Sequence, residues 1–239
     1  MLIPIIIIIL IQIILLHPWL YFMNGILSFY CNNSAYLTVK EKLEIFPISQ
    51  SLEKNYENIK KDFLNYPHKI PTFNKMLPEF VVTKDELWKV LPLKTTGKII
   101  NSNFSYFPSL KNILPHPSIH NAFFSIMEPS CKLPPHIGPY KGYLRYHLGI
   151  IIPEENNKPF ISVNKEIYYW KDGEGIMFDD MYEHYAENPT SKNRVVLFID
   201  VIRPLKGLID YLNRFSIFLI EINPIMKRIQ RIQHESVKI

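Results

Sequence analysis

Four short runs decide the fold of this 239-residue chain: Leu133-Pro-Pro-His-Ile-Gly138, Leu144-Arg-Tyr-His-Leu-Gly149, Phe178-Asp-Asp-Met-Tyr-Glu-His184 and Arg194-Val-Val-Leu-Phe-Ile-Asp200. In the second run apolar residues alternate with Arg145 and His147, so these two side chains share one face of a predicted strand. Short strands of this kind, separated by turns over ~80 residues, predict a β-barrel or a β-sandwich.

The same period of two extends beyond these runs. Apolar residues recur at alternate positions from Ala122, and Asn164-Lys165 separates two strand-like segments as a hairpin turn would. The predicted strands therefore include 122–127, 144–148, 160–163, 166–170, 175–178 and 195–202. We place the β core at residues 122–205.

Both flanks of this core carry helical patterns. Residues 31–121 are predicted as a helical and loop-rich lead-in, with apolar residues at helical spacing between Leu52 and Leu64. Within it, Asp85–Val90 is a short helix or an edge strand. Residues 206–239 form a C-terminal helical segment that Pro224 interrupts. This segment is either packed on the barrel or lies on a membrane as a basic amphipathic helix.

The first 30 residues predict a membrane anchor. Leu2–Leu16 is apolar except for Gln12, and no charged residue precedes Lys40. A run of about 20 apolar residues is long enough to cross the ~30 Å hydrocarbon core. A cleaved signal peptide is the rival, but its usual positive n-region is missing. Lys40 and Lys42 favour, weakly, a cytoplasmic side for the rest of the chain.

Composition excludes several classes of protein. The net charge is +5 and the pI is about 9.0, yet no dense Lys/Arg block interleaves with aromatic residues, so nucleic acid is not expected as a partner. Two cysteines, Cys31 and Cys131, give no disulfide framework and are predicted as free thiols. The length suits one sizeable domain with an appendage, and the sequence sets no oligomeric state.

Together the four runs resemble the aspartyl/asparaginyl β-hydroxylase family, a branch of the Fe(II)/2-oxoglutarate dioxygenases. The resemblance covers roughly Phe123–Leu205. It implies a mainly β double-stranded β-helix (a jelly-roll, cupin-like barrel) with flanking helices. The runs Arg145–Gly149, Trp170–Glu174 and His184–Asn188 look especially like the bacterial lipid A acyl-chain hydroxylases of that family.

By this resemblance His136 and His184, 48 residues apart, are the ligands of Fe(II), with zinc as the alternative metal. Arg194 looks like the residue that binds the distal carboxylate of the cosubstrate 2-oxoglutarate, because a guanidinium matches a carboxylate with two hydrogen bonds. The second cosubstrate is O2. Further 2-oxoglutarate contacts are implied for Arg145, His147, Ser125 and Met127.

One position departs from the common dioxygenase pattern. The usual motif is His-x-Asp/Glu, whereas Gly138 stands where the third, carboxylate ligand would be. The animal members of the family also have glycine here, with water in the vacant coordination position. Asp179 and Asp180 are candidates for a hydrogen bond to that water or to a ligand imidazole, or they stabilise a turn. Trp88 is expected to border the substrate cleft.

Three functions remain open on this basis. Gly138 favours hydroxylation of the β-carbon of Asp or Asn in a protein, and we expect this substrate first. The membrane anchor and the Arg145–Gly149 run favour a lipid acyl chain instead. Loss of the carboxylate ligand also motivates a third hypothesis, a non-catalytic membrane-bound module that binds 2-oxoglutarate or metal.

Overall fold

The computed structural model describes residues 2–77 and 86–235, with side chains described from residue 16 onward. Its strands are β1 (Trp88–Thr95), β2 (Lys98–Ile99), β3 (Ile119–Met127), β4 (Lys132–His136), β5 (Tyr143–Ile151), β6 (Phe160–Val163), β7 (Glu166–Tyr169), β8 (Gly175–Phe178), β9 (His184–Glu187) and β10 (Arg194–Ile202). Its helices are α1 (Leu2–Tyr30), α2 (Val39–Ile45), α3 (Ser49–Lys54), α4 (Tyr56–Leu64), α5 (Phe73–Met76), α6 (Asn101–Phe104), η1 (Pro108–Leu110, a 3₁₀ turn), α7 (Gly207–Ile222) and α8 (Pro224–Glu235).

Strands β3 to β10 form a rolled-up antiparallel hairpin. β3 pairs with β10, β4 with β9, β5 with β8 and β6 with β7, so that each pair nests inside the one before it. Rolling adds the pairs β5–β10 and β6–β9 and closes two sheets, with the orders β2-β1-β3-β10-β5-β8 and β4-β9-β6-β7. Eight strands in this arrangement are a jelly roll, which confirms the predicted fold class.

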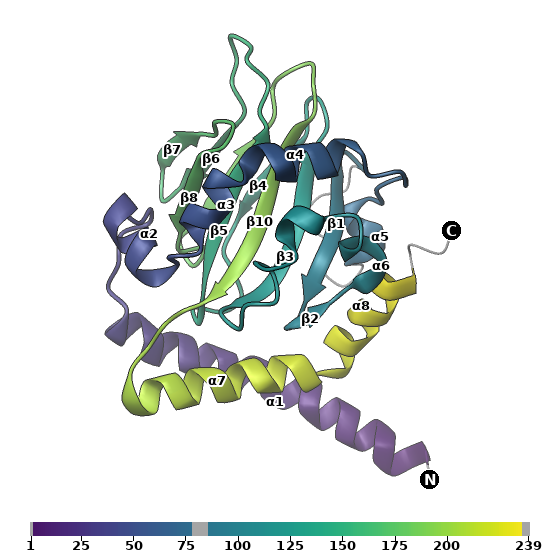
Figure 1. Ribbon diagram of the computed structural model, residues 1–239. Helices are drawn as coiled ribbons and strands as arrows, with labels where there is room; N and C mark the ends of the chain where they lie inside the picture. Colours follow the sequence, from purple (N-terminus) through teal and green to yellow (C-terminus); the bar gives the residue numbers. More distant parts are fainter. Residues whose placement is uncertain (1, 78–85, 236–239) are drawn as a thin grey trace.

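Alternation along the strands gives the larger sheet two different faces. In β10 the residues Val195, Leu197, Ile199 and Val201 are buried on the outer face, where they join the apolar core beneath α3 and α4 (Figure 1). The intervening side chains of β10 point between the two sheets. This alternation brings Arg194 and three further inward positions to the interior of the roll.

The larger sheet extends upstream of the predicted β core. β1 pairs with β3 from Trp88 opposite Met127 to Lys94 opposite Ala122. Of the stretch expected as a short helix or an edge strand, Trp88–Val90 is therefore strand, and Asp85 lies outside the described residues. β1 forms because alternate residues bury both of its faces: Leu91 packs in the outer core and Val90 in the inner one.

Two local predictions are met by the backbone. The Asn164-Lys165 turn joins β6 to β7, and both residues have positive φ values, 51° and 68°, as a two-residue hairpin turn requires. After Pro204 the chain is helical, and the break at Pro224 separates α7 from α8. Pro224 begins α8, where its missing N–H costs nothing.

The helices α1 and α7 cross beneath the barrel (Figure 1). Trp19 of α1 donates a hydrogen bond from Nε1 to Ser216 Oγ of α7 at 2.9 Å, and Met23 and Leu27 are buried in the same contact. The predicted membrane anchor, residues 1–30, coincides with α1, but the side chains of residues 1–15 lie outside the description. Within the described part of the chain, no helix combines the length and the apolarity needed to span a bilayer.

Candidate active site

Two histidines face each other across the smaller sheet. His136 ends β4 and His184 begins β9, and the two residues are direct partners in the ladder. Their ring centroids are 4.2 Å apart. His136 Nδ1 lies 2.8 Å from the carbonyl oxygen of Pro134, and His184 Nδ1 lies 3.0 Å from that of Tyr182. Because a carbonyl only accepts, Nδ1 carries the proton in each ring and the Nε2 lone pair is left available.

Burial keeps both imidazoles neutral. It lowers the pKa of His136, and it lowers the pKa of His184 to about 3, with the Arg145 charge adding to the effect. His184 Nε2 is buried without a hydrogen-bond partner. A neutral imidazole with a buried, unpartnered lone pair is the form in which histidine binds a metal ion.

The strands that carry these histidines had no clear signal in the sequence. β4 contains Pro134 and Pro135, which cannot donate to a ladder, and its register shifts between Leu133 and His136. β9 is only four residues long. β4 and β9 are stabilised because they pair with each other, and β9 also pairs with β6. The two-histidine geometry is therefore a product of tertiary pairing rather than of local propensity.

Arg194 is a buried cation without a carboxylate partner among the described residues. Its side chain is 2 % exposed, its Nη1 donates to the Ser125 carbonyl at 3.1 Å, and its Nε has no partner. The guanidinium lies over the ring of Trp170, 4.4 Å from the centroid. Burial lowers the pKa of Arg194 to about 9. An uncompensated buried charge is costly, so this arrangement suits an incoming anion.

Ser125 and His147 lie beside this guanidinium in one narrow cavity of about 40 Å³, which His136, His184 and Arg194 also line. Ser125 Oγ accepts a hydrogen bond from Trp88 Nε1 at 2.9 Å, so its own hydroxyl proton remains free for a ligand.

Both ring nitrogens of His147 are buried without partners, and burial holds the pKa of His147 well below its usual range. His147 is therefore neutral, and it offers one donor and one acceptor to whatever fills the cavity.

Three apolar residues near Arg194 differ in whether they line the narrow cavity. Trp170 and Phe178 are buried in the inner core and also line the cavity. Tertiary packing brings Trp170, which follows β7, over Arg194, so no local signal in the sequence marks it. Met127 is fully buried in the inner core and does not line the cavity.

Asp180 occupies the space that a side chain at position 138 would need. A Cβ atom added to Gly138 would lie 1.9 Å from Asp180 Oδ2, and the Gly138 N–H donates to the Asp180 carbonyl at 2.7 Å. Burial raises the pKa of the Asp180 carboxyl to about 6, although Arg145 Nη2 lies 3.0 Å from it. The Asp180 carboxyl thus fills the space beside Gly138 but lines neither cavity, and its Oδ1 has no partner.

Asp179, the other acidic candidate, forms buried ion pairs that stabilise the fold. Its Oδ2 accepts from Lys141 Nζ at 2.9 Å and from Arg203 Nη2 at 2.8 Å, and the side chain is fully buried. Burial alone would raise its pKa, but these two cations outweigh burial and lower it. Asp179 lines neither cavity and ties the end of β8 to β10 and to the loop before β5.

Arg145 is already paired. Besides Asp180, its Nε lies 3.4 Å from Asp200 Oδ1, and its guanidinium stacks over Phe198 at 4.8 Å. Of the two arginines implied as 2-oxoglutarate contacts, Arg194 is therefore the one whose charge is uncompensated.

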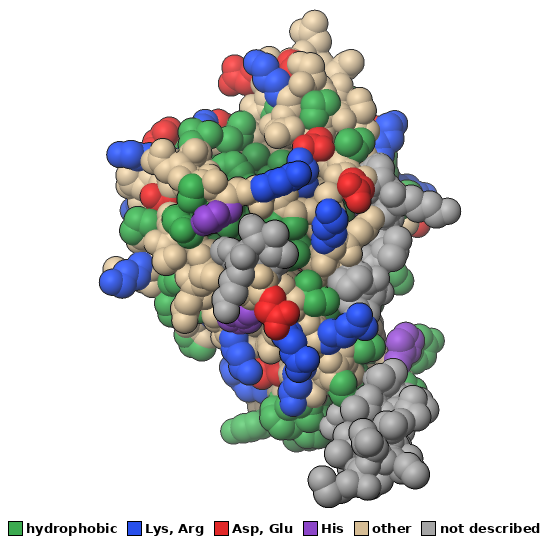
Figure 2. All heavy atoms as spheres, turned by 90° about the vertical axis from the view of Figure 1, so that its right-hand side faces the viewer, with side chains coloured by type: hydrophobic (Ala, Val, Ile, Leu, Met, Phe, Trp, Pro, Cys, Tyr) green, Lys and Arg blue, Asp and Glu red, His purple; other side chains and the backbone are tan. Residues whose placement is uncertain are grey.

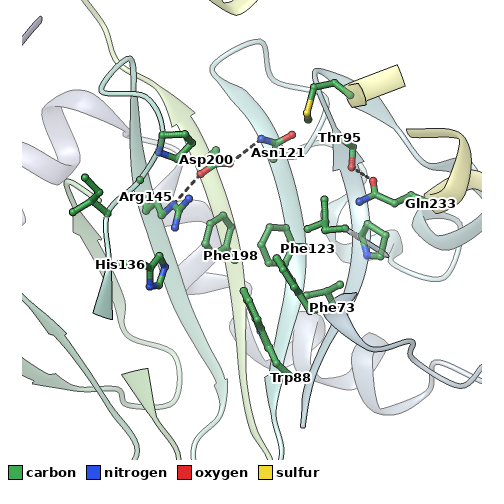
Figure 3. Close-up of a pocket in the computed structure, with 17 residues that line it drawn as sticks. Phe73, Trp88, Thr95, Asn121, Phe123, His136, Arg145, Phe198, Asp200 and Gln233 are labelled. Carbon is green, nitrogen blue, oxygen red and sulfur yellow. Dashed lines mark hydrogen bonds and ion pairs between the residues drawn. The ribbon is translucent and has the colours of Figure 1, made fainter. Parts of the chain in front are cut away.

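A second, larger cavity of about 340 Å³ adjoins the first (Figure 3). The two share Trp88, His136, Arg145 and Phe198 as walls. Phe123 stacks on Phe198 with centroids 4.1 Å apart, and the two rings lie on the inner face of β3 and β10. The cavity is further lined by Phe73, Leu77, Val90, Pro92, Thr95, Asn121, Ile137, Gly138, Pro139, Asp200, Met226 and Gln233.

The larger cavity is mostly apolar. Among the described residues, its charged lining groups are Arg145 and Asp200, which pair with each other, and Asn121 donates to Asp200 Oδ2 at 2.8 Å. Trp88 stacks face to face on Phe73, with centroids 3.8 Å apart. Trp88, expected at the substrate cleft, thus lines both cavities.

The described residues offer two protein ligands for a metal ion, His136 and His184, and no third. Across residues 2–77 and 86–235 there is no group of three or more His, Cys, Asp or Glu side chains placed to hold a metal ion. The neutral imidazoles and the unpartnered His184 Nε2 nevertheless fit a metal bound by two histidines, with its other positions left to non-protein ligands.

A jelly roll with two facing histidines and a buried, unpaired arginine defines a class of oxygenase-like proteins. The sequence model of the Aspartyl/Asparaginyl beta-hydroxylase family matches residues 53–204. The chain belongs to this family, which confirms the resemblance and extends it upstream to residue 53. The expectation of a dioxygenase-like enzyme is thereby confirmed at the level of the family.

Two curated relatives are similar over different lengths. An ornithine lipid ester-linked acyl 2-hydroxylase from Rhizobium tropici is 36% identical over 187 residues, which are 76% of this chain and 66% of that protein. The mouse aspartyl/asparaginyl beta-hydroxylase is 38% identical over 81 residues, which are 34% of this chain and 11% of that protein. The chain thus spans slightly less than two thirds of the first relative and about a tenth of the second.

Among solved structures, an oxidoreductase of the 2OG-Fe(II) oxygenase family from Burkholderia pseudomallei is similar with a TM-score of 0.44 and 10% identity. The match covers 62% of this chain and 78% of that one.

Proposed function

We propose that this protein is an Fe(II)- and 2-oxoglutarate-dependent hydroxylase that acts on the acyl chain of a lipid. The observation that carries the reaction type is the narrow cavity, where two neutral histidines face a buried guanidinium without a carboxylate partner. His136 and His184 would hold Fe(II) through Nε2, each with its Nδ1 proton fixed on a backbone carbonyl. When bound, Fe(II), 2-oxoglutarate and O2 together supply the oxidising power that converts C–H to C–OH.

The remaining residues of the cavity bind and orient. Arg194 would take the far carboxylate of 2-oxoglutarate in a bidentate pair, and the Ser125 hydroxyl can donate to the same group. His147 can donate from one ring nitrogen and accept at the other. Trp170 and Phe178 exclude water from the cavity wall, which protects a reactive site from side reactions. Asp180 can accept a hydrogen bond through Oδ1 from a water near position 138.

The lipid substrate is favoured by the larger cavity. An Asp or Asn side chain would bring polar groups into a cavity whose charged residues already pair with each other, and this desolvation is costly. An acyl chain has no such requirement and buries apolar surface against Phe123 and Phe198. The 36% identity to a lipid acyl hydroxylase supports the same choice. The β-carbon of Asp or Asn, which the sequence favoured through Gly138, becomes the second candidate.

A membrane location is proposed from the surface formed by α1 and α7. Eight of the large apolar side chains exposed on the described residues belong to these two helices: Tyr21, Phe22, Phe29, Tyr30, Leu208, Tyr211, Phe215 and Phe218. Figure 2 shows Lys and Arg side chains gathered just above apolar side chains at the lower end of one face. Aromatic rings beside basic residues are typical of a membrane interface. A cytoplasmic side for the barrel stays a prediction.

The first experiment needs no substrate. The full chain is mixed with Fe(II) and 2-oxoglutarate without oxygen, and the visible charge-transfer band of the complex is recorded. We expect a band in the wild type and its loss in His136→Ala and Arg194→Gln. His68→Ala, an exposed histidine outside both cavities, is the matched control and should keep the band. A folded wild type without the band would contradict the iron and 2-oxoglutarate assignment.

Turnover then separates an enzyme from a non-catalytic binding module. With oxygen added, succinate formation that depends on an ester-linked acyl lipid, and a lipid heavier by one oxygen atom, are the expected results. Hydroxylation of an Asp- or Asn-containing peptide instead would support the second candidate. Binding of 2-oxoglutarate without turnover on either substrate would favour the non-catalytic module.

A further inference from the structure

A hydrogen-bonded pair from two different elements lines the larger cavity at the end opposite His136. Thr95 at the end of β1 donates from Oγ1 to Gln233 Oε1 of α8 at 2.5 Å. Both side chains are buried, and both line the cavity. In Figure 3 this pair lies across the cavity from His136, with the rings of Phe198 and Phe123 between them.

One turn earlier on α8, a second contact fixes the same helix without entering the cavity. Gln230 Nε2 donates to Thr96 Oγ1, and it also lies 3.5 Å from the Thr95 carbonyl. Gln230 and Thr96 do not line the cavity. The two glutamines therefore hold α8 to the same end of β1, but only Gln233 faces the cavity.

An apolar chain that runs from His136 along the rings of Phe198 and Phe123 meets the Thr95–Gln233 pair at the end of its path. It can neither donate nor accept a hydrogen bond, so it cannot replace this contact. Growth of the chain past the pair would break the hydrogen bond between Thr95 Oγ1 and Gln233 Oε1 and put no other hydrogen bond in its place, which is unfavourable. Each methylene group before that point adds buried apolar surface and tightens binding about fourfold.

We propose that the Thr95–Gln233 pair is the end stop of the acyl site and sets the longest acyl chain that the protein accepts. This inference rests on the proposed lipid substrate. It makes Gln233, a residue of the C-terminal helix across the cavity from His136, a determinant of specificity for chain length.

The test measures binding to the iron-free full chain, so that it does not depend on turnover. Straight-chain fatty acids that differ by two methylene groups compete with a fluorescent fatty-acid probe. For the wild type we expect affinity to rise with length and then to stop rising. Gln233→Ala should move this limit to longer acids, with a gain of about tenfold for the first acid beyond the wild-type limit.

Three further variants make the test specific. Gln233→Trp should move the limit to shorter acids, and Thr95→Val, which keeps the shape of Thr95 but removes its donor, should move it to longer ones. Gln230→Ala is the matched control on α8 and should leave the limit in place. A limit that stays unchanged in all the Gln233 and Thr95 variants would overturn the end stop alone. A wild type that binds no fatty acid would overturn the acyl site itself, and the iron and 2-oxoglutarate assignment would still stand on its own spectrum.

Discussion

At the scale of single residues, the absence of a side chain at position 138 is a packing requirement. The Asp180 carboxylate fills the space beside Gly138 and is held there by Arg145. Gly138→Ala is therefore expected to displace Asp180 and to lower the free energy of unfolding by about 2 kcal/mol. Urea denaturation measures this loss. Gly25→Ala, whose new Cβ meets no atom within 4 Å, is the control and should be neutral or slightly stabilising.

A charge swap sharpens the same prediction. Gly138→Asp alone should be more disruptive than Gly138→Ala, because it places a second carboxylate against Asp180. Combining it with Asp180→Gly frees the space and leaves one carboxylate to face Arg145, so at least about 1 kcal/mol of the loss should be regained. Losses that simply add in the double variant would show that the two positions do not share this space.

Substitution by methionine should lower the free energy of unfolding strongly at one buried arginine, Arg203, but not at the other, Arg194. Arg203→Met removes a partner of the buried Asp179 carboxylate and should cost about 3 kcal/mol of stability. Arg194 has no such carboxylate, so Arg194→Met should change stability by less than about 1 kcal/mol or increase it. Arg194→Met should nevertheless abolish the binding of 2-oxoglutarate, which calorimetry measures with Fe(II) present. Equal destabilisation by both variants would make Arg194 a structural residue.

At the scale of elements, the contact between β3 and α7 makes stability depend on pH. His120 is 1 % exposed, stacks on Tyr143, and its Nε2 lies 3.2 Å from Glu221 Oε1 of α7. Burial, with the Lys94 charge adding to it, lowers the pKa of His120 to about 4 from 6.5. The half-exposed Glu221 carboxylate does not offset this burial. The neutral imidazole therefore donates a hydrogen bond to Glu221 rather than forming an ion pair.

The sign of the pH effect follows from the depressed pKa. The stabilising contribution of neutral His120 is complete above pH 6.5 and is lost as the pH falls towards 4, by up to about 3 kcal/mol. His120→Phe keeps a ring against Tyr143 but cannot be protonated. As the pH falls from 6.5 to 4, the free energy of unfolding of the wild type should therefore fall relative to that of the variant. A difference that is constant with pH would contradict a buried neutral His120.

At the scale of the whole molecule, the α1–α7 surface should meet the bilayer while the barrel stays in water. In a Cys31→Ser background, Tyr211→Cys on α7 is labelled with a fluorophore that reports polarity. Vesicles with anionic phospholipids should shift its emission to the blue. The same label on Ile167→Cys, an exposed apolar residue of β7, should not shift. Equal shifts, or none at position 211, would argue against this orientation.

Much of the fold could be predicted because it depends on local chemistry. Alternating apolar residues marked β5, an apolar run marked β10, and the Asn164-Lys165 turn marked the β6–β7 hairpin. Backbone conformation and side-chain period are properties of a few neighbouring residues. The four runs that contain His136, His184 and Arg194 indicated the family by their resemblance to it.

Tertiary structure alone decided the contents of the site. β4 and β9 exist through pairing, Asp180 enters the space beside Gly138, and Trp170 covers Arg194. The larger cavity likewise combines α5, β1, β3, β10 and α8, which are distant in sequence. Close packing determines which remote side chain fills a given volume, and no local preference of the chain encodes that choice.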